Sequence, residues 1–382
     1  MKINTLQLKN YTAMNTKKYL IILLSLFLLI NNLPLSACST FMINNGKSFL
    51  IGHNLDMNIE ISGMIYINKR GLEKESVSFV ELFDGITDSL PRLKWVSKYG
   101  SVTYNPIGCE LIDGGLNEAG LYIGEMSLNQ NHQYPVFKNR PKISVALWMQ
   151  YILDNFASVD EVVKFVPGAA IDGQGFNWHF FVTDKKGNQA IIEFVNGKTI
   201  IHKNDDMPVK LLCNTQYADD MDTLKQYQGF GGNRVIDLKN KSEKNRIISG
   251  AEMLQFNKHN PGESDVNYAF DILKQLDFGI TKWSIVYDVK NMKMYYRTSI
   301  DSIVKHFDFS SYDFSCKNPV MMLDINKNLR SEDVIKDFIP YTKQENKAQL
   351  EKLFSAIGMK EKKTFPEMVE RFADYPEKMK CK

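Results

Sequence analysis

The sequence lacks most of the patterns by which metal and cofactor sites are recognised. Among 382 residues there are five cysteines and six histidines, and no CxxC or HExxH spacing occurs. A zinc site is therefore not expected. No GxSxG motif is present, and the glycines at 229–232 lack the strand and helix that flank a phosphate-binding loop. We therefore predict neither a metal nor a cofactor.

Charge of one sign is also scarce. The 47 basic and 44 acidic residues leave a net charge of +3, spread along the chain in mixed runs. Nucleic-acid-binding domains usually carry a concentrated basic patch, so we expect no nucleic-acid partner. Hydrophobic residues make up 44% of the chain and charged residues 24%, which is typical of a globular protein with a large core.

Long apolar runs are absent except near the N-terminus. Lys17 and Lys18 precede an apolar run at 19–30, and the small residues Ser36 and Ala37 close the segment. This order is that of a signal peptide, and the run is shorter than the roughly 20 residues that span a bilayer. We expect residues 1–37 to be a signal peptide, the mature protein to be exported to the periplasm or outside the cell, and no membrane span.

Cys38, directly after this segment, has two interpretations that exclude each other. The letters LSAC satisfy a lipobox, which predicts a lipid-anchored binding protein with Cys38 acylated. Alternatively, Cys38 becomes the first residue of an N-terminal nucleophile enzyme. A lipid anchor usually needs a flexible polar spacer, but the strand-like residues 39–43 follow at once. The enzyme is therefore favoured, and the lipoprotein stays the alternative.

The other cysteines carry no readable pairing. Cys109 and Cys213 lie in apolar segments and are interpreted as buried thiols. Whether Cys109, Cys213, Cys316 and Cys381 form disulfides is left open.

Blocks of strands and helices follow one another along the chain. Short β-type runs separated by turn residues fill 38–128, and apolar residues at helical spacing follow at 143–166. A β meander is predicted over 177–217, helices over 243–256 and 266–276, and a hairpin over 282–298. This order favours an α+β sandwich over alternating βαβ units. We expect one domain over 38–328 and a charged, helical C-terminal extension over 329–382.

The first predicted hairpin gives Cys38 a chemical setting. Asn45–Gly46 between two apolar runs predicts a two-residue loop. That register places His53 directly opposite Cys38, with Cβ atoms about 4.5–5.5 Å apart, and Asp56 where the strand leaves the pair. A free α-amine has a pKa of about 7.7–8.0 and can accept the thiol proton. Cys38 would then supply both nucleophile and base, with Asp56 orienting the amine.

Residues 38–56, CSTFMINNGKSFLIGHNLD, resemble the opening of the choloylglycine hydrolase and penicillin V acylase family of linear amide C–N hydrolases. Mature chains of that family begin with Cys and continue to a G-R-N-x-D motif. The resemblance implies that Cys38 is the nucleophile and Asp56 the aspartate that orients the amine. Where the family has arginine this sequence has His53, so the family's substrate preference does not carry over, and less weight falls on bile salts.

Later segments resemble the family in the family's order, over most of 38–325. GGLNEAGLYIGEMSL at 114–128 is similar to the family's N-E-x-G-L turn and strand, with Ser127 matching an oxyanion-hole position. LLCNTQY resembles a strand ending in T-N-S, which implies Asn214 as an oxyanion donor. SEKNRIISGAEML resembles a helix start S-x-x-R, which implies a site role for Arg246.

The resemblance implies an αββα four-layer sandwich, with two stacked antiparallel sheets between helical layers. It also implies hydrolysis of a small amphipathic N-acyl amide, such as a conjugated bile acid or penicillin V, through a thioester on Cys38. His53 is expected to tune the thiol or the substrate pocket. Acyl transfer from the same thioester, the identity of the amide and a homo-oligomeric state stay open.

Overall fold

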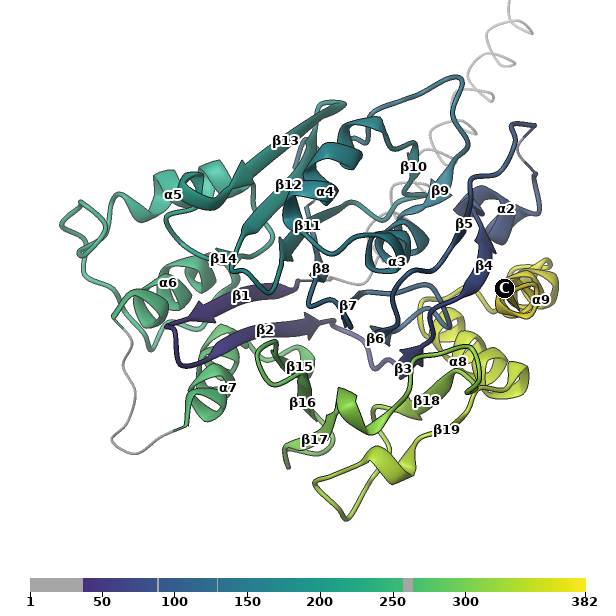
Figure 1. Ribbon diagram of the computed structural model, residues 1–382. Helices are drawn as coiled ribbons and strands as arrows, with labels where there is room; N and C mark the ends of the chain where they lie inside the picture. The colour runs from purple at the N-terminus through teal and green to yellow at the C-terminus, as the bar shows by residue number, and fades with distance from the viewer. Residues whose placement is uncertain (1–36, 88, 129, 257–263) are drawn as a thin grey trace, which may run out of the picture. The chain divides into compact units, whose positions relative to one another are not determined.

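Two antiparallel sheets lie face to face at the centre of the fold (Figure 1). The computed structural model describes residues 37–382 except 88, 129 and 257–263, so the predicted signal peptide, Ala37 apart, lies outside the described residues. The smaller of the two sheets has, in spatial order, strands β14 (Leu211–Leu212), β1 (Ser39–Asn44), β2 (Phe49–Asp56), β15 (Thr281–Asp288), β16 (Lys293–Thr298) and β17 (Lys305–Asp308).

The larger sheet has nine strands and packs against the smaller sheet. In spatial order these are β13 (Lys198–Lys203), β12 (Gln189–Val195), β11 (Trp178–Thr183), β8 (Tyr122–Ser127), β7 (Gly114–Asn117), β6 (Ser101–Asn105), β3 (Met64–Asn68), β18 (Met321–Asp324) and β19 (Ile339–Pro340). Two small sheets complete the strands: β9 (Ile143–Ser144) with β10 (Ile171–Asp172), and β20 (Lys380–Cys381), β4 (Leu72–Glu75) and β5 (Lys94–Val96).

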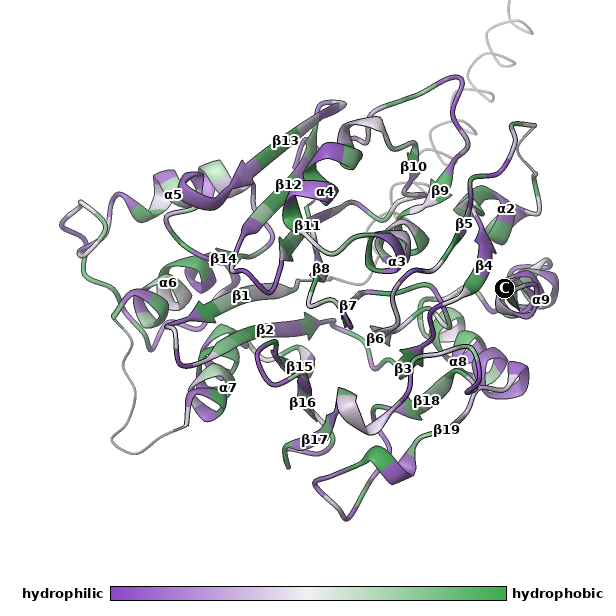
Figure 2. Ribbon diagram, viewed as in Figure 1, coloured by the Kyte–Doolittle hydropathy of each residue, from purple (hydrophilic) through white to green (hydrophobic). Residues whose placement is uncertain are grey.

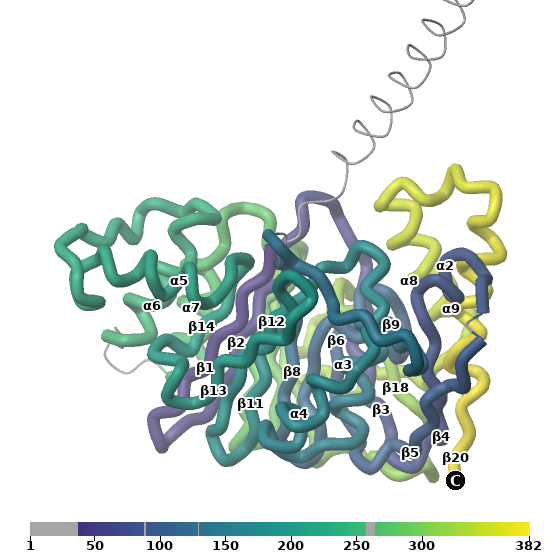
Figure 3. Tube along the Cα trace, turned by 90° about the horizontal axis from the view of Figure 1, so that it is seen from above, coloured from purple at the N-terminus to yellow at the C-terminus, as the bar shows by residue number. Residues whose placement is uncertain are grey.

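Helices cover the outer face of each sheet, which confirms the predicted four-layer α+β sandwich. Helices α3 (Val145–Asn155) and α4 (Val159–Phe165) pack on the nine-stranded sheet, and α6 (Arg246–Phe256) and α7 (Asp265–Leu276) pack on the six-stranded sheet. In Figure 3 the two helical groups lie over different sheets. The remaining helices are α2 (Phe79–Asp84), α5 (Tyr217–Leu224), α8 (Lys343–Ala356) and α9 (Phe365–Glu377).

Strand β1 is buried on both faces because it lies between these layers. Phe41 and Ile43 pack among the apolar side chains of α6 and α7. Cys38 and Met42 belong to the core between the two sheets. All residues of β1 except Asn44, and all residues of β2 and β12, are buried, as packing on two faces requires. The alternation of side chains along β1 therefore directs the Cys38 thiol toward the nine-stranded sheet.

The predicted register of the first hairpin is wrong by two residues. Thr40, not Cys38, pairs with His53, and the backbone N–H of Ala37 donates to the carbonyl of Asp56 at 3.0 Å. Because a shift by two preserves the alternation of faces, His53 still lies on the same face of the hairpin as Cys38. Asp56 is the last residue of β2, at the strand end where the sequence predicted it.

The loop is longer than two residues because the Asn45 side chain caps it. Its Oδ1 accepts the backbone N–H groups of Lys47 at 3.0 Å and Ser48 at 2.9 Å, while Gly46 adopts a φ of 81°. Asparagine side chains commonly hold such turns. The loop therefore includes all four residues from Asn45 to Ser48.

The predicted meander over 177–217 holds only for its first three strands. Strands β11, β12 and β13 are neighbours in the nine-stranded sheet, joined by turns in which Gly187 and Gly197 have positive φ. The last segment, β14, pairs instead with β1, through Thr40 with Leu212 and Phe41 with Leu211. The chain crosses between the sheets here, and the crossing brings residues after 212 beside Cys38.

Residues 329–382 fold against the main sheets within the same compact unit. Helix α9 packs on α8 and α2, burying Met368, Val369 and Phe372. Strand β20 adds to β4, and a disulfide joins Cys316 to Cys381. In Figure 2 both helices alternate between hydrophilic and hydrophobic residues, as expected for helices that cover a core with one face.

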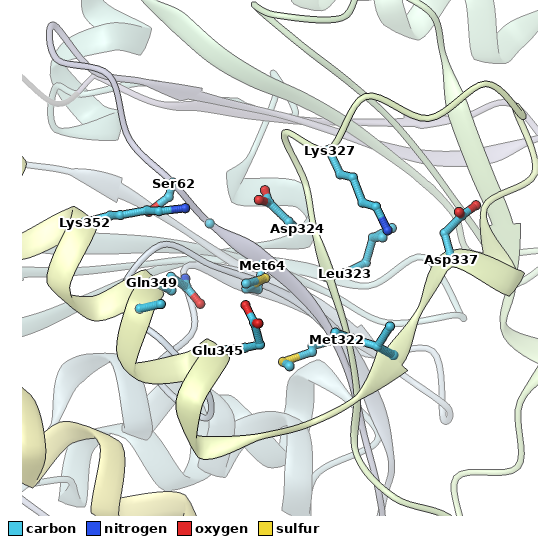
Figure 4. A pocket seen from close by; sticks show the side chains of 13 residues that line it. Ser62, Met64, Met322, Leu323, Asp324, Lys327, Asp337, Glu345, Gln349 and Lys352 are labelled. Carbon is cyan, nitrogen blue, oxygen red and sulfur yellow. The ribbon is translucent and has the colours of Figure 1, made fainter.

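A pocket of about 240 Å³ lies between β3, β18 and α8 (Figure 4). Met64 and Met322 form apolar parts of its lining, and charged side chains of the strand side and of α8 surround it. None of the site residues predicted from the sequence lines this pocket.

Candidate active site

Cys38 lies at the start of β1, fully buried, with its thiol between the sheets. The thiol donates a hydrogen bond to Oε1 of Glu125 at 3.7 Å. Burial raises the pKa of Cys38 well above its usual value, and the charges of Glu125, Asp113 and Asp56 raise it further. The backbone N–H of Asp56 acts in the opposite direction. In this state the thiol is protonated, so attack on a carbonyl needs a base to remove its proton.

Arg246, the first residue of α6, lies on the other face of β1 and connects several of the predicted site residues from there. Its Nη1 donates to the Cys38 carbonyl at 3.0 Å, to Oγ of Ser39 at 2.9 Å and to Oδ2 of Asp56 at 3.2 Å. Its Nη2 donates to Oδ1 of Asn214. The guanidinium is almost completely buried. One cation thus aligns the nucleophile's backbone, the carboxylate and the amide predicted from the sequence.

Asp56 is held by partners on both carboxyl oxygens. Oδ1 accepts from the Thr281 hydroxyl at 2.5 Å, and Oδ2 accepts from Arg246. Burial raises the pKa of Asp56 to about 7, although Arg246 and Thr281 each act to lower it. A carboxyl with that pKa changes its charge within the physiological range.

Asn214 lies beside Cys38 because β14 pairs with β1. Continuing the register of Thr40 with Leu212 by two residues places Asn214 opposite Cys38. Its Nδ2 donates to the backbone carbonyl of Ser127 at 2.8 Å. A side-chain amide carries two N–H groups, so this bond fixes the amide plane while using one of them. Ser127 therefore enters the site through its backbone.

His53 faces the same inter-sheet space as the thiol. Its Nδ1 lies 2.7 Å from Oγ1 of Thr40, and its Nε2 lies 4.0 Å from Oδ2 of Asp113. Its ring packs on Tyr104 with centroids 4.9 Å apart. Burial lowers the pKa of His53 to about 3. The imidazole is therefore neutral at physiological pH.

Sequence reasoning missed Asp113 and Glu125, which flank the thiol. The two carboxyls are both buried, and each shifts the pKa of the other. Glu125 had a visible signal, because it is a charged residue inside the apolar strand segment YIGEMS. Asp113 precedes two glycines and reads as an ordinary turn residue. Thr281 and Ser39, which support Asp56 and Arg246, were also missed.

The arrangement suits acyl chemistry at sulfur. A buried thiol, an amide donor and a carboxylate–guanidinium pair meet at one end of β1. The α-nitrogen of Cys38 is joined to Ala37 in the described chain, so it becomes an amine only when the peptide bond before Cys38 is cut. Among the described residues, no three His, Cys, Asp or Glu side chains are grouped to hold a metal ion. Nor does any described helix have the length and apolar character to cross a bilayer.

Comparison with known families and proteins places this site in a wider group. A model of the linear amide C-N hydrolases, choloylglycine hydrolase family, matches residues 38–249, which is more than half of the chain and begins at Cys38. The chain is 27% identical over 280 residues to the penicillin V acylase of Pectobacterium atrosepticum, a match that covers 62% of this chain and 73% of that protein.

Solved structures share the fold. Penicillin V acylase from Agrobacterium tumefaciens superposes with a TM-score of 0.67 at 21% identity, covering 80% of this chain and 98% of that chain. A mutant of the conjugated bile acid hydrolase from Clostridium perfringens superposes with a TM-score of 0.60 at 15% identity, covering 76% of this chain and 97% of that chain. Both therefore have the same sandwich architecture.

Proposed function

Because the chain belongs to the choloylglycine hydrolase family of linear amide C–N hydrolases, we propose that it is an exported enzyme whose N-terminal Cys38 cleaves a small N-acyl amide. Removal of residues 1–37 would expose the α-amine of Cys38. The observation that carries the proposal is the convergence on Cys38 of Arg246, Asp56 and Asn214, through hydrogen bonds of one guanidinium.

The proposed reaction begins with the free α-amine. It takes the proton from the Cys38 thiol, and the sulfur attacks the amide carbon while the carbonyl π pair moves to oxygen. The Asn214 amide and a backbone N–H stabilise that oxyanion. The protonated amine then donates to the leaving nitrogen as the C–N bond breaks, which leaves a thioester. Water attacks the thioester, the C–S bond breaks, and the proton returns to sulfur.

The proposed substrate is a small amphipathic amide. The relatives are a penicillin V acylase and a conjugated bile acid hydrolase, so N-acyl compounds of these kinds form the first panel to test. Release of the acyl group to water gives an acid, whereas acyl transfer to an added amine gives a new amide. Product analysis by mass spectrometry separates these two outcomes.

The decisive experiment varies what precedes residue 38. A protein that begins Met–Cys38 should lose its methionine, since cysteine is small, and should hydrolyse an amide from the panel. A protein with a tag ahead of Ala37 should fold equally well but be inactive, because its nitrogen at residue 38 is an amide that cannot accept a proton. Cys38→Ala in the trimmed form should also be inactive, by at least about 10³-fold.

Hydrolysis and intact N-terminal mass are measured on all three proteins. Equal activity of the tagged, unprocessed chain contradicts the N-terminal nucleophile mechanism. A triacylated Cys38 in protein purified from its export compartment would support the lipid-anchored alternative instead.

A further inference from the structure

Two carboxyls from different segments meet beside the thiol. Glu125 lies on β8 and Asp113 just before β7, and the backbone N–H of Glu125 donates to the Asp113 carbonyl at 3.1 Å. Each carboxyl shifts the pKa of the other, and Oε1 of Glu125 accepts from the Cys38 thiol. Two adjacent buried carboxyls share a proton, because two negative charges side by side repel. Burial raises the pKa of Asp113 to about 7, so above that pH the pair carries one negative charge.

The described residues around this carboxyl pair provide no cation to neutralise it. The causes that shift the pKa values of Asp113 and Glu125 are burial, the contact of the two carboxyls with each other and, for Glu125, the Cys38 thiol; no Lys or Arg is among them. His53 is neutral at physiological pH. The titratable side chains that interact with the pair are Cys38, His53, Tyr104, Tyr122 and Tyr134.

The guanidinium of Arg246 serves the opposite face of β1. It is bonded to Asp56, and the two charges offset each other when that carboxyl is ionised, as the proposed reaction requires. In the mature protein the α-amine of Cys38 adds a partial positive charge, with a pKa of about 7.7–8.0. However, the reactive form has a neutral amine, because only that form accepts the thiol proton. In the reactive form the space next to the sulfur therefore carries the negative charge of the carboxyl pair.

We propose that the Glu125–Asp113 carboxyl pair makes this enzyme select amides whose groups near the scissile bond are neutral or cationic, and reject amides with a carboxylate there. This inference rests on the proposed function of Cys38 and narrows its substrate class: glycine conjugates, which carry a carboxylate two bonds from the amide nitrogen, become poor substrates among the compounds of the first panel. A carbonyl carbon bonded to sulfur lies within a few ångströms of Glu125, so a carboxylate two or three bonds away is repelled in a low-dielectric site. At such distances the repulsion amounts to at least about tenfold in rate.

Matched substrates test the proposal on the unaltered mature protein. Phenoxyacetyl-glycine and phenoxyacetyl-glycinamide have the same acyl group and nearly the same size but differ by one negative charge, and phenoxyacetyl-ethylenediamine adds a cation. We expect kcat/KM for the glycinamide to exceed that for the glycine compound by at least about tenfold. Equal values, or a preference for the glycine compound, overturn the proposal.

Alkylation of the thiol tests the same charge without turnover. Iodoacetate and iodoacetamide differ by one charge, and their rates at Cys38 are followed by peptide mass spectrometry and normalised to a free N-terminal cysteine peptide. The normalised ratio should favour iodoacetamide by at least about tenfold. If no amide is cleaved but this ratio holds, the hydrolase function fails while the acidic site stands. If amides are cleaved but both ratios are near one, the function stands and the inference fails.

Variants then assign the effect to the pair. Glu125→Gln or Asp113→Asn alone leaves one carboxyl, so each should reduce the discrimination only in part. In the double variant, the kcat/KM ratio of the glycinamide to the glycine compound and the normalised iodoacetamide to iodoacetate ratio should both fall to a value between about 1 and 3. Glu110→Gln removes a buried carboxyl that bonds to Lys74 instead of the thiol, and it should leave both ratios unchanged. An unchanged ratio in a folded double variant contradicts the assignment.

Discussion

The two faces of β1 surround the same cysteine with opposite electrostatics. On the helix side, Arg246 and Asp56 form a buried ion pair that also holds the Cys38 carbonyl and Asn214. On the sheet side, the Glu125–Asp113 carboxyl pair contacts the thiol, and His53, whose Nε2 lies 4.0 Å from Asp113, is neutral at physiological pH. The helix side is thus suited to aligning the nucleophile. The sheet side is suited to selecting what approaches it.

This division predicts that changes on the helix side affect rate and stability, while changes on the sheet side affect preference. The largest expected effect is at Arg246. Arg246→Ala leaves Asp56 buried without its partner, which typically costs about 3–5 kcal/mol of unfolding free energy. It also releases the Cys38 carbonyl and Asn214, so we expect kcat/KM to fall on the order of 10³-fold.

Urea unfolding and steady-state kinetics measure the two effects of Arg246→Ala. Arg297→Ala is the matched control, because Arg297 donates to the backbone carbonyl of Phe270 and packs on its ring, away from Cys38 and Asp56. It should lose less stability and keep its kcat. Near-normal turnover in a folded Arg246→Ala protein would show that the helix side does not align the nucleophile.

The next largest effect is expected at Asn214. Asn214→Ala removes the proposed oxyanion donor, and loss of one such donor typically lowers kcat by about 10²–10³-fold. Asn117 is the control, since its buried amide also donates to backbone carbonyls, those of Leu153 and Phe156. Asn117→Ala should lower the melting temperature but not kcat. If both variants lose stability and neither loses kcat, Asn214 is a structural residue.

Asp56 gives the helix side a pH dependence. Its pKa of about 7 is raised above the ordinary aspartate value, so the folded protein binds this proton more tightly than the unfolded chain. The contribution of Asp56 to the free energy of unfolding is full at pH values below the ordinary aspartate pKa. It is lost as the pH rises through about 7. Activity has the opposite sign if the ionised carboxylate is needed, since it rises as the proton leaves.

The pH–rate profile of Asp56→Asn separates the titration of Asp56 from that of the α-amine. Below pH 7 the unaltered enzyme should lose about a hundredfold per pH unit, because Asp56 and the α-amine must both be deprotonated. In Asp56→Asn the remaining activity should fall only about tenfold per unit. Asp220→Asn is the control, as burial raises the pKa of that carboxyl to about 6; the steep slope should persist there. A steep slope in Asp56→Asn would assign it to another group.

The smallest effect is expected at His53, on the sheet side. With a pKa of about 3, His53 should contribute no limb to the profile near neutral pH, and His53→Ala should change kcat/KM by less than about tenfold. His53→Arg places a cation near Asp113 and should weaken discrimination against acyl-glycine substrates. Profiles and substrate ratios unchanged in both variants would reduce His53 to a structural residue.

The sequence alone predicted much of the fold and the helix side of the site. Alternating apolar residues bounded by turns located β1, β2, β11–β13 and the hairpin of β15 and β16, because burial imposes that pattern on each strand. The family resemblance of the motifs implied site roles for Asp56, Asn214 and Arg246, and the structure brings these three together through the guanidinium of Arg246 at the start of α6. Short strands such as β7, β14 and β17 were missed or misplaced, because a strand of two to four residues is too short to show the alternation of apolar and polar side chains.

What local sequence determined about this protein is which side chains share a face: Cys38 and His53 stay together even though their register was wrong by two. Only the tertiary structure decided what those faces meet. Asp113 and Glu125 reach the thiol because the second sheet packs against β1, and Cys316 reaches Cys381 because β20 adds to β4. The charge next to the nucleophile follows from burial, which depends on every layer around it and is not written in any single segment.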